Sequence, residues 1–331
     1  MIAQLDKEYI KTRPSKVWSR MVSYSLFEGR PLTTKGRWIN PLVFGVLKTF
    51  AALPSTRQVD RPIFILGTGR SGSTILGKVL SMHKDLAFLN EPKAMWALLN
   101  KEEDLMGSYN LNAGRYRISE AEATNSVIKR ANRIFGGALL MSGQRRFVDK
   151  YPELIFRTPF VSKIFPDARY IFLTRNVDST CSSISYWSER KGTESSEGKA
   201  DWWGLNNRKW DAVVNELVPE HADLAEHKDE ILVLSEEGRA AVEWVVTMRE
   251  GLRLCEQSPE SCIHIPYDKL CGNSADWSKK LADFLQLSHD PVFDDYSKTT
   301  LVEPARHNRV ALPSWLRTIT DDIEKKLESV K

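Results

Sequence analysis

The sequence predicts an α/β fold, with a mostly parallel central sheet and helices on both faces. Three observations support this. Short apolar runs that are typical of buried strands alternate with longer segments of helical apolar spacing. The first such run leads directly into a glycine-rich loop and then a helix. No internal repeat or long linker interrupts residues 61–331, so we expect one domain there, preceded by a helical N-terminal extension over residues 1–60.

The loop after the first strand has the composition of an anion-binding site. Residues 62–66 (PIFIL) form the predicted strand, and the loop that follows reads Gly67-Thr68-Gly69-Arg70-Ser71-Gly72-Ser73-Thr74. Its glycines allow a sharp turn that brings backbone N–H groups together at the positive end of the next helix. Strand, loop and helix start therefore predict a phosphate cradle.

The cradle departs from the loop of nucleoside-triphosphate enzymes at one position. Its Gly67-x-x-x-x-Gly72 spacing is that of a P-loop, but Ser73-Thr74 stands where those enzymes have Lys followed by Ser or Thr. The positive charge lies inside the loop instead, at Arg70. We therefore expect the loop to hold a phosphate in a different way from an ATPase. A plain glycine turn without a ligand is the alternative interpretation.

Composition narrows the class of protein. The 331 residues carry a net charge of only +4, which gives no whole-protein case for nucleic-acid binding. Four cysteines without a C-x-x-C pair argue against a zinc site or a disulfide framework, so we expect a reduced, cytoplasmic chain. The N-terminus lacks a basic segment followed by an apolar core, and no secretory signal is expected.

Beyond the loop, apolar patterns predict the remaining elements. We expect strands over residues 87–89, 146–150, 168–174 and 261–266, and helices over 93–99, 152–164, 178–187, 236–255, 277–285 and 314–327, with residues 101–145 mostly helical around a loop at 109–116. Residues 188–206 contain Gly, Ser, Lys and Glu and predict an exposed loop or lid. Tryptophans 187, 202, 203 and 210 either pack in the core or cover a sugar ring or lipid headgroup.

The N-terminal extension is basic, with eleven Lys or Arg against four Asp or Glu in residues 1–62. Residues 38–53 are apolar but too short and too charged to span a bilayer. We expect a helix that packs on the main domain. The alternative is a peripheral membrane contact through residues 30–54, supported by their basic flanks.

A second anion site is predicted at the end of another strand. Arg175 follows the strand over residues 168–174, and Ser183 lies eight residues further on in the next helix. Ligands bind at this edge of doubly wound sheets, and a guanidinium with a hydroxyl can hold one phosphate. A nucleoside-triphosphate enzyme more often has a magnesium-binding Asp at such a strand end. The pattern therefore favours a ligand with two anionic groups and no required metal.

These motifs resemble the sulfotransferases that use 3′-phosphoadenosine 5′-phosphosulfate (PAPS). The resemblance covers about residues 61–287: the Gly69–Thr74 loop, Asn90-Glu91-Pro92, Phe165-Pro166-Asp167-Ala168, Arg175, Ser183, Tyr267-Asp268-Lys269-Leu270 and Asp283-Phe284-Leu285-Gln286-Leu287. It implies the P-loop-like sulfotransferase fold, with PAPS as sulfuryl donor, the bisphosphate PAP as product and no metal. The implied acceptor is a hydroxyl or amine of a carbohydrate, lipid or small molecule.

The resemblance also implies roles for individual residues. Gly69, Arg70, Ser71, Gly72, Ser73 and Thr74 would hold the 5′-phosphosulfate, Arg175 and Ser183 the 3′-phosphate, and Arg306 and Arg309 in the tail would close on the same phosphate. Glu91 resembles the general base of the carbohydrate- and tyrosine-modifying branches, with His307 the next candidate, whereas His83 is interpreted as structural. Arg70 and Lys150 would neutralise charge on the leaving group. Structural alternatives are a helix-terminus role for Glu91 and a pairing of Lys150 with Asp149.

Two other functions remain open on the sequence alone. A P-loop small-molecule kinase should have the loop Lys and a metal-binding Asp, and the chain lacks the first and offers no clear candidate for the second. A non-catalytic sulfotransferase-like protein could bind membranes or partners through residues 1–60. The joint presence of Arg70, Glu91, Arg175 and Ser183 favours the enzyme.

Overall fold

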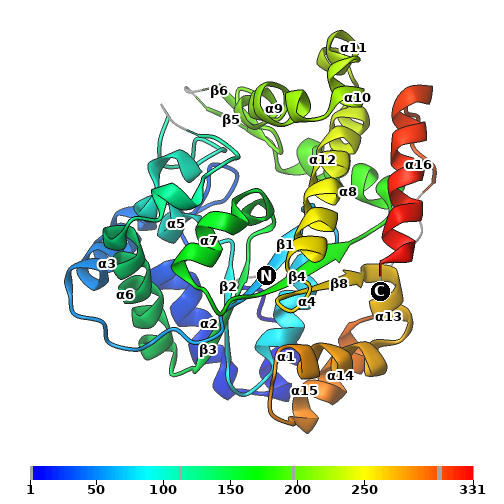
Figure 1. The fold of residues 1–331 in the computed structure, drawn as a ribbon. Coiled ribbons are helices and arrows are strands. Elements are labelled where there is room, and N and C mark those ends of the chain that lie inside the picture. Colours follow the sequence, from blue (N-terminus) through cyan, green and yellow to red (C-terminus); the bar gives the residue numbers. More distant parts are fainter. Residues whose placement is uncertain (1–2, 112–113, 196–197, 304–307, 331) are drawn as a thin grey trace.

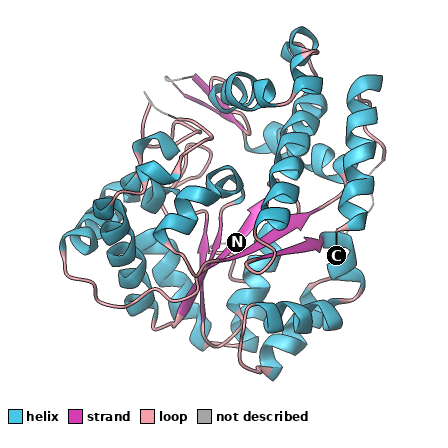
Figure 2. Ribbon diagram, viewed as in Figure 1, coloured by secondary structure: helices cyan, strands magenta, loops and turns pink. Residues whose placement is uncertain are grey.

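Five parallel strands form the central sheet of the computed structural model, which describes residues 3–111, 114–195, 198–303 and 308–330. The strands are β1 (Ile63–Gly67), β2 (Leu86–Asn90), β3 (Arg146–Lys150), β4 (Arg169–Thr174) and β8 (Cys262–Pro266), in the order β2–β3–β1–β4–β8. Helices enclose the sheet (Figures 1 and 2). The predicted α/β class and the parallel sheet are confirmed.

Helices cover both faces of the sheet, as the near-continuous apolar strands require. One face packs on α3 (Asn40–Ala52), α5 (Lys93–Leu99), α6 (Asn125–Ser142), α7 (Thr158–Ile164), α8 (Val177–Lys191), α12 (Glu236–Gln257) and α16 (Ser314–Ser329). The other packs on α1 (Lys7–Thr12), α4 (Ser73–Ser81), α13 (Tyr267–Gly272), α14 (Ser274–Phe284) and α15 (Pro291–Thr300). Neighbouring strand residues divide between the two layers: Phe64 lies in the first core and Ile65 in the second.

After α1, which packs on the second core, residues 15–52 pack on the first. Helix α2 (Ser15–Val22), the turn η1 (Ser23–Phe27), the turn η2 (Arg37–Ile39) and α3 follow one another there. The buried Arg20 guanidinium pairs with the Glu28 carboxylate at 2.5 Å, and that carboxylate also accepts a hydrogen bond of 2.7 Å from the Asn90 N–H. The interaction fixes the N-terminal segment to the end of β2. The division at residue 60 stays a prediction.

Three helical regions differ from the sequence prediction. Residues 101–145 contain the short turns η3 (Lys101–Glu103) and η4 (Glu120–Glu122), and the α-helical part is limited to α6. The segment predicted as one helix over 152–164 is divided into the 3₁₀ turn η5 (Pro152–Arg157) and α7, which begins beside a second proline, Pro159. Helix α15 was not predicted, because its apolar residues are few and Asp-rich sequence surrounds them.

The prediction of an exposed loop or lid over residues 188–206 is confirmed only in part: residues 189–194 are exposed, but the segment is not an irregular loop. Helix α8 continues to Lys191, and β5 (Thr193–Ser195), β6 (Gly198–Asp201) and β7 (Gly204–Leu205) form an antiparallel sheet. The Trp203 side chain is fully buried, stacks edge-on against Trp210 and donates a hydrogen bond of 2.6 Å to Glu236. Burial of this indole holds the segment against the protein. The remaining short elements are α9 (Arg208–Ala212), η6 (Val213–Leu217), η7 (Val218–Glu220), α10 (Ala222–Ala225) and α11 (Lys228–Leu232).

We predict that Trp203→Ala lowers the free energy of unfolding by about 3–5 kcal/mol, because it removes a fully buried aromatic side chain. Chemical denaturation followed by circular dichroism measures the change. Tyr186→Ala is the matched control, because Tyr186 is largely exposed and its loss should cost less than about 0.5 kcal/mol. Equal effects of the two substitutions would contradict the burial of Trp203 against Trp210.

Candidate active site

The glycine loop after β1 forms a tight cradle at the start of α4. Arg70 and Gly72 both have left-handed backbone conformations, with φ of +69° and +90°. A methyl group at Gly72 would overlap the Tyr267 ring, which packs directly on the loop, and one at Gly69 would overlap the Trp202 ring. The loop thus needs glycine where two aromatic rings approach it. Free N–H groups in the first turn of α4 remain for an anion.

The two predicted anion sites meet in the structure. The Arg70 Nε donates a hydrogen bond of 3.1 Å to the Ser183 Oγ on α8, and an Arg175 Nη lies 3.4 Å from the Arg70 carbonyl oxygen. Arg175 also lies over the Tyr267 ring, with 5.7 Å between guanidinium and ring centroid. Loop and strand end therefore form one continuous surface.

Neither guanidinium has an acidic partner among the described residues. Arg70 and Arg175 form no ion pair in residues 3–111, 114–195, 198–303 and 308–330, and the buried Arg175 Nε has no hydrogen-bond acceptor there. Burial lowers the pKa of Arg70; Glu91 opposes that shift and Arg175 adds to it. Two unneutralised cations this close together favour an anion between them.

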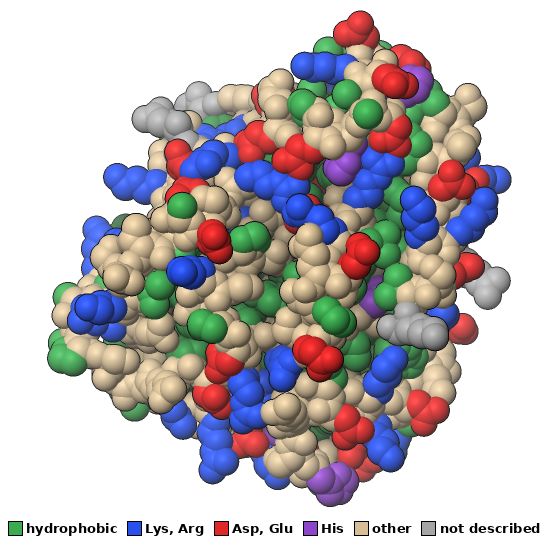
Figure 3. All heavy atoms as spheres, viewed as in Figure 1, with side chains coloured by type: hydrophobic (Ala, Val, Ile, Leu, Met, Phe, Trp, Pro, Cys, Tyr) green, Lys and Arg blue, Asp and Glu red, His purple; other side chains and the backbone are tan. Residues whose placement is uncertain are grey.

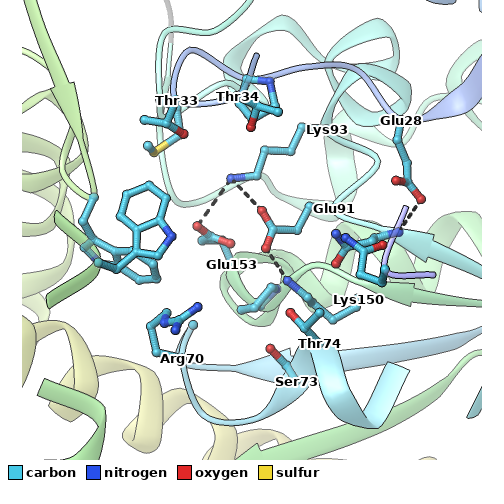
Figure 4. Close-up of a pocket in the computed structure, with 18 of the residues that line it drawn as sticks. Glu28, Thr33, Thr34, Arg70, Ser73, Thr74, Glu91, Lys93, Lys150 and Glu153 are labelled. Carbon is cyan, nitrogen blue, oxygen red and sulfur yellow. Dashed lines mark hydrogen bonds and ion pairs between the residues drawn. The ribbon is translucent and has the colours of Figure 1, made fainter. Parts of the chain in front are cut away.

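Glu91 and Lys150 form an ion pair that faces the same cavity, beside the start of α4 (Figure 4). The register of β2 and β3 causes this, because Asn90 lies opposite Lys150 and the Glu91 N–H then donates to the Lys150 carbonyl oxygen at 2.8 Å. Glu91 has φ of +52°, a conformation that costs a non-glycine residue about 1–3 kcal/mol and is concentrated at functional sites. Its side chain is 35% exposed, and it faces the cavity.

Lys93 is a second cation beside Glu91, and it is not among the site residues predicted from the sequence. Its Nζ lies 3.6 Å from a Glu91 oxygen and 3.7 Å from a Glu153 oxygen (Figure 4). Burial alone would raise the pKa of Glu91, but the ammonium groups of Lys150 and Lys93 outweigh it and hold that pKa below its ordinary value. Glu91 is therefore ionised at neutral pH and can accept a proton. The sequence feature that could have indicated Lys93 is its position two residues after the predicted base, Glu91.

A chain of ion pairs continues from Glu153 across the cavity. The Lys209 Nζ lies 3.7 Å from Glu153 and 2.6 Å from Glu243. Glu243 accepts a hydrogen bond of 2.7 Å from the Trp202 indole, the ring that covers the loop at Gly69. This series of ion pairs and hydrogen bonds connects Glu91, through Lys93, to the Trp202 ring that covers the loop. No local sequence pattern marks Lys209 or Glu243, which come from α9 and α12.

These groups line a cavity of about 550 Å³, within the roughly 300–1,000 Å³ usual for ligand sites. The predicted residues that line it are Gly69, Arg70, Gly72, Ser73, Thr74, Glu91, Lys150, Arg175 and Ser183. The N-terminal segment adds Glu28 to Pro31, Thr33 and Thr34, and Trp187 and Trp202 add aromatic rings. Residues 28–34, outside the sequence resemblance, therefore form part of the wall.

Two predicted residues do not reach the cavity. Ser71 is fully buried beneath the loop, and its hydroxyl has no partner among the described residues. Arg309 is largely exposed and lies 3.2 Å from Asp321 on α16. Arg306 and His307 lie outside the described residues. Within the described part of the chain, no three His, Cys, Asp or Glu side chains come together as a metal site, and no helix has the length and apolarity to cross a membrane.

Comparison with known proteins identifies the family. Residues 62–235, more than half of the chain, match the model of the Sulfotransferase family. The chain therefore belongs to the sulfotransferase family.

The curated relatives are distant. Protein-tyrosine sulfotransferase A of Caenorhabditis elegans is 22% identical over 288 residues, which cover 81% of this chain and 64% of that protein. Nodulation protein NoeE of Sinorhizobium fredii is 28% identical over 133 residues, covering 38% of this chain and 31% of that protein. The match thus spans less than two thirds of either relative.

Solved structures are similar at lower identity. The sulfotransferase domain of the Synechococcus olefin synthase has a TM-score of 0.49 at 16% identity and covers 84% of this chain and 98% of that domain. Sulfotransferase STF9 of Mycobacterium avium has a TM-score of 0.49 at 13% identity and covers 95% of this chain and 85% of that protein.

The contacts of Glu91 lead to a prediction about its titration. Lys93→Met removes one of the two cations that lower its pKa, so we expect this pKa to rise and the carboxylate to protonate at a higher pH. A ¹³C NMR titration, with the Glu91 signal assigned by its absence in Glu91→Gln, measures the change. Lys279→Met on the exposed side of α14 is the control and should leave the titration unchanged. An unchanged Glu91 curve in Lys93→Met would remove Lys93 from the site.

Proposed function

We propose that this protein transfers a sulfuryl group from PAPS to an acceptor hydroxyl. The observation that carries the proposal is the pair of guanidiniums without acidic partners, Arg70 and Arg175, facing the same cavity as the ionised Glu91. PAPS carries two separate anionic groups, the 5′-phosphosulfate and the 3′-phosphate, and would supply an activated sulfuryl group. Family membership supports this class of reaction.

The residues present fit such a donor. The N–H groups at the start of α4, with the Ser73 and Thr74 hydroxyls, would hold the 5′-phosphosulfate, and the free Arg175 Nε with Ser183 would hold the 3′-phosphate. Because the Arg70 side chain lies against Ser183, it is placed to neutralise either group. The Trp202 and Tyr267 rings at the loop offer flat apolar surfaces to the remainder of the nucleotide.

Glu91 would accept the proton, and Lys150 would neutralise the leaving group. Glu91 accepts the proton that the acceptor hydroxyl loses as its oxygen bonds to sulfur. Lys150, paired with Glu91, neutralises the negative charge that develops on the departing bisphosphate oxygen as the old sulfur–oxygen bond breaks. Lys93 and Glu153 hold Glu91 in position.

The acceptor side of the cavity indicates a polar, uncharged group. Thr33, Thr34 and Met106 line it, and its charged residues Lys93 and Glu153 neutralise one another. Arg30 also lines the cavity, and its guanidinium donates to the carbonyl oxygens of Glu28 and Tyr24. We therefore favour a carbohydrate, lipid or small-molecule hydroxyl as acceptor. Incubation with ³⁵S-labelled PAPS and a panel of sugars, phenols, lipids and tyrosine peptides tests this. We expect label on at least one hydroxyl acceptor, and a panel that stays unlabelled would contradict the proposal.

Donor binding should depend on the second anion site. We predict that Arg175→Ala weakens PAP binding by about 10-fold to 150-fold, because it removes a charge-assisted contact worth about 1.5–3 kcal/mol. Calorimetry in the presence of a chelator measures the affinity, and ATP with magnesium should bind far more weakly than PAP. Arg190→Ala on the exposed end of α8 is the control. Unchanged PAP affinity in Arg175→Ala, or tighter binding of magnesium–ATP, would favour another ligand class.

Catalysis should depend on the Glu91 carboxylate. We predict that Glu91→Gln lowers kcat by about 10²–10⁴-fold, the usual contribution of a general base, while PAP affinity barely changes. Glu189→Gln, at an exposed position of α8, controls for the loss of a carboxylate. Turnover by Glu91→Gln at the parent rate would show that Glu91 is structural and that another group accepts the proton.

A further inference from the structure

Helix α3 exposes an unusually apolar surface. Its sequence, NPLVFGVLKTFAA, is apolar except at Asn40, Lys48 and Thr49, yet only Val43 and Leu47 are fully buried. Trp38, just before the helix, is 83% exposed, Leu42 is 55% exposed and Leu53 is 44% exposed. Such a helix is usually enclosed by other elements or by lipid. We name this surface the α3 face, and its exposed residues are Trp38, Pro41, Leu42, Gly45, Lys48, Thr49, Ala52 and Leu53.

The charge around the α3 face has one sign. Between Glu28 and Asp60 the sequence contains no acidic residue. Lys35, Arg37 and Lys48 are exposed, and none of them has an ion-pair partner within the described ranges of the chain. Hydrophobic and basic side chains reach the surface at the left edge of Figure 3, where Figure 1 places α3.

We propose that the α3 face docks this protein on an anionic membrane surface. An exposed tryptophan and leucine beside unpaired cations is the combination that interfacial helices use: the apolar groups enter the headgroup region and the cations approach anionic lipids. A second copy of the chain fits this surface less well, because a two-fold contact through it would bring like charges together.

The segment that would contact the membrane directly follows cavity-lining residues in the sequence. Thr33 and Thr34 line the cavity wall, and Lys35, Arg37 and Trp38 follow immediately. The segment that would contact lipid is thus the continuation of the segment that bounds the acceptor side. Membrane docking is independent of the proposed sulfuryl transfer, and either can fail without the other.

Vesicle flotation tests the docking. The full chain is mixed with vesicles of phosphatidylcholine alone, or with about 30% phosphatidylglycerol, at low and high salt. We expect binding to the anionic vesicles at low salt, weaker binding at high salt, and little binding to the neutral vesicles. Replacing Lys35, Arg37 and Lys48 together by Gln should weaken binding about a hundredfold, at about fivefold for each cation.

The apolar part of the face is tested separately. Trp38→Ser with Leu42→Ser should weaken binding to the anionic vesicles by more than about tenfold. Val233→Ser is the matched control, because Val233 is as exposed as Trp38 but lies at the end of α11, and it should bind like the parent. Melting temperatures verify that each variant is folded. Absence of parent binding to anionic vesicles, parent-like binding by both groups of variants, or a parent dimer that the Trp38 and Leu42 substitutions dissociate would overturn the proposal.

Discussion

The cavity depends on two positive charges that the protein itself does not neutralise. Arg70 and Arg175 lie at adjacent strand ends without an acidic partner among the described residues, because the nearby Glu91 carboxylate is paired with Lys150 and Lys93. Partly buried like charges repel one another, so this arrangement destabilises the empty site and stabilises a bound anion. The parallel register of the sheet brings these groups to one edge, and the helices on both faces hold the register.

The contacts of Glu91 explain how a partly buried carboxylate is kept ionised. Burial opposes the charge on Glu91, and two ammonium groups outweigh that effect. The same cations limit how strongly Glu91 attracts a proton, so in the proposed reaction it would be an ionised but weak base. Glu153 is held by Lys93 and Lys209 in the same way, and its pKa falls to about 2, so it remains a fixed negative charge that balances the lysines.

Local signals predicted the part of the site that short stretches of chain form on their own. The strand, the glycine loop and the start of α4 follow one another in sequence. Glu91, Lys150 and Arg175 each stand at the end of a predicted strand or just after it, so parallel pairing brings them to the same edge of the sheet. The sequence does not show which of the four tryptophans are buried. The spacing of Trp203 and Trp210, which lie in the core, does not distinguish them from Trp187 and Trp202, which line the cavity.

The rest could not be predicted, because it depends on contacts between distant segments. Lys209 and Glu243 reach the cavity only through the packing of α9 and α12, and residues 28–34 only through the Arg20–Glu28 ion pair. Ser71 shows the opposite case: loop composition suggested a ligand contact, but the backbone turns its hydroxyl inward.

We propose that the cavity recognises two anionic groups on one nucleotide. Comparing the affinities of PAP and adenosine 5′-monophosphate by calorimetry tests it most directly, because the two ligands differ only in the 3′-phosphate. We expect PAP to bind at least about tenfold more tightly, since the 3′-phosphate adds charge-assisted contacts of about 1.5–3 kcal/mol each. Equal affinities would show that Arg175 and Ser183 do not form a second anion site.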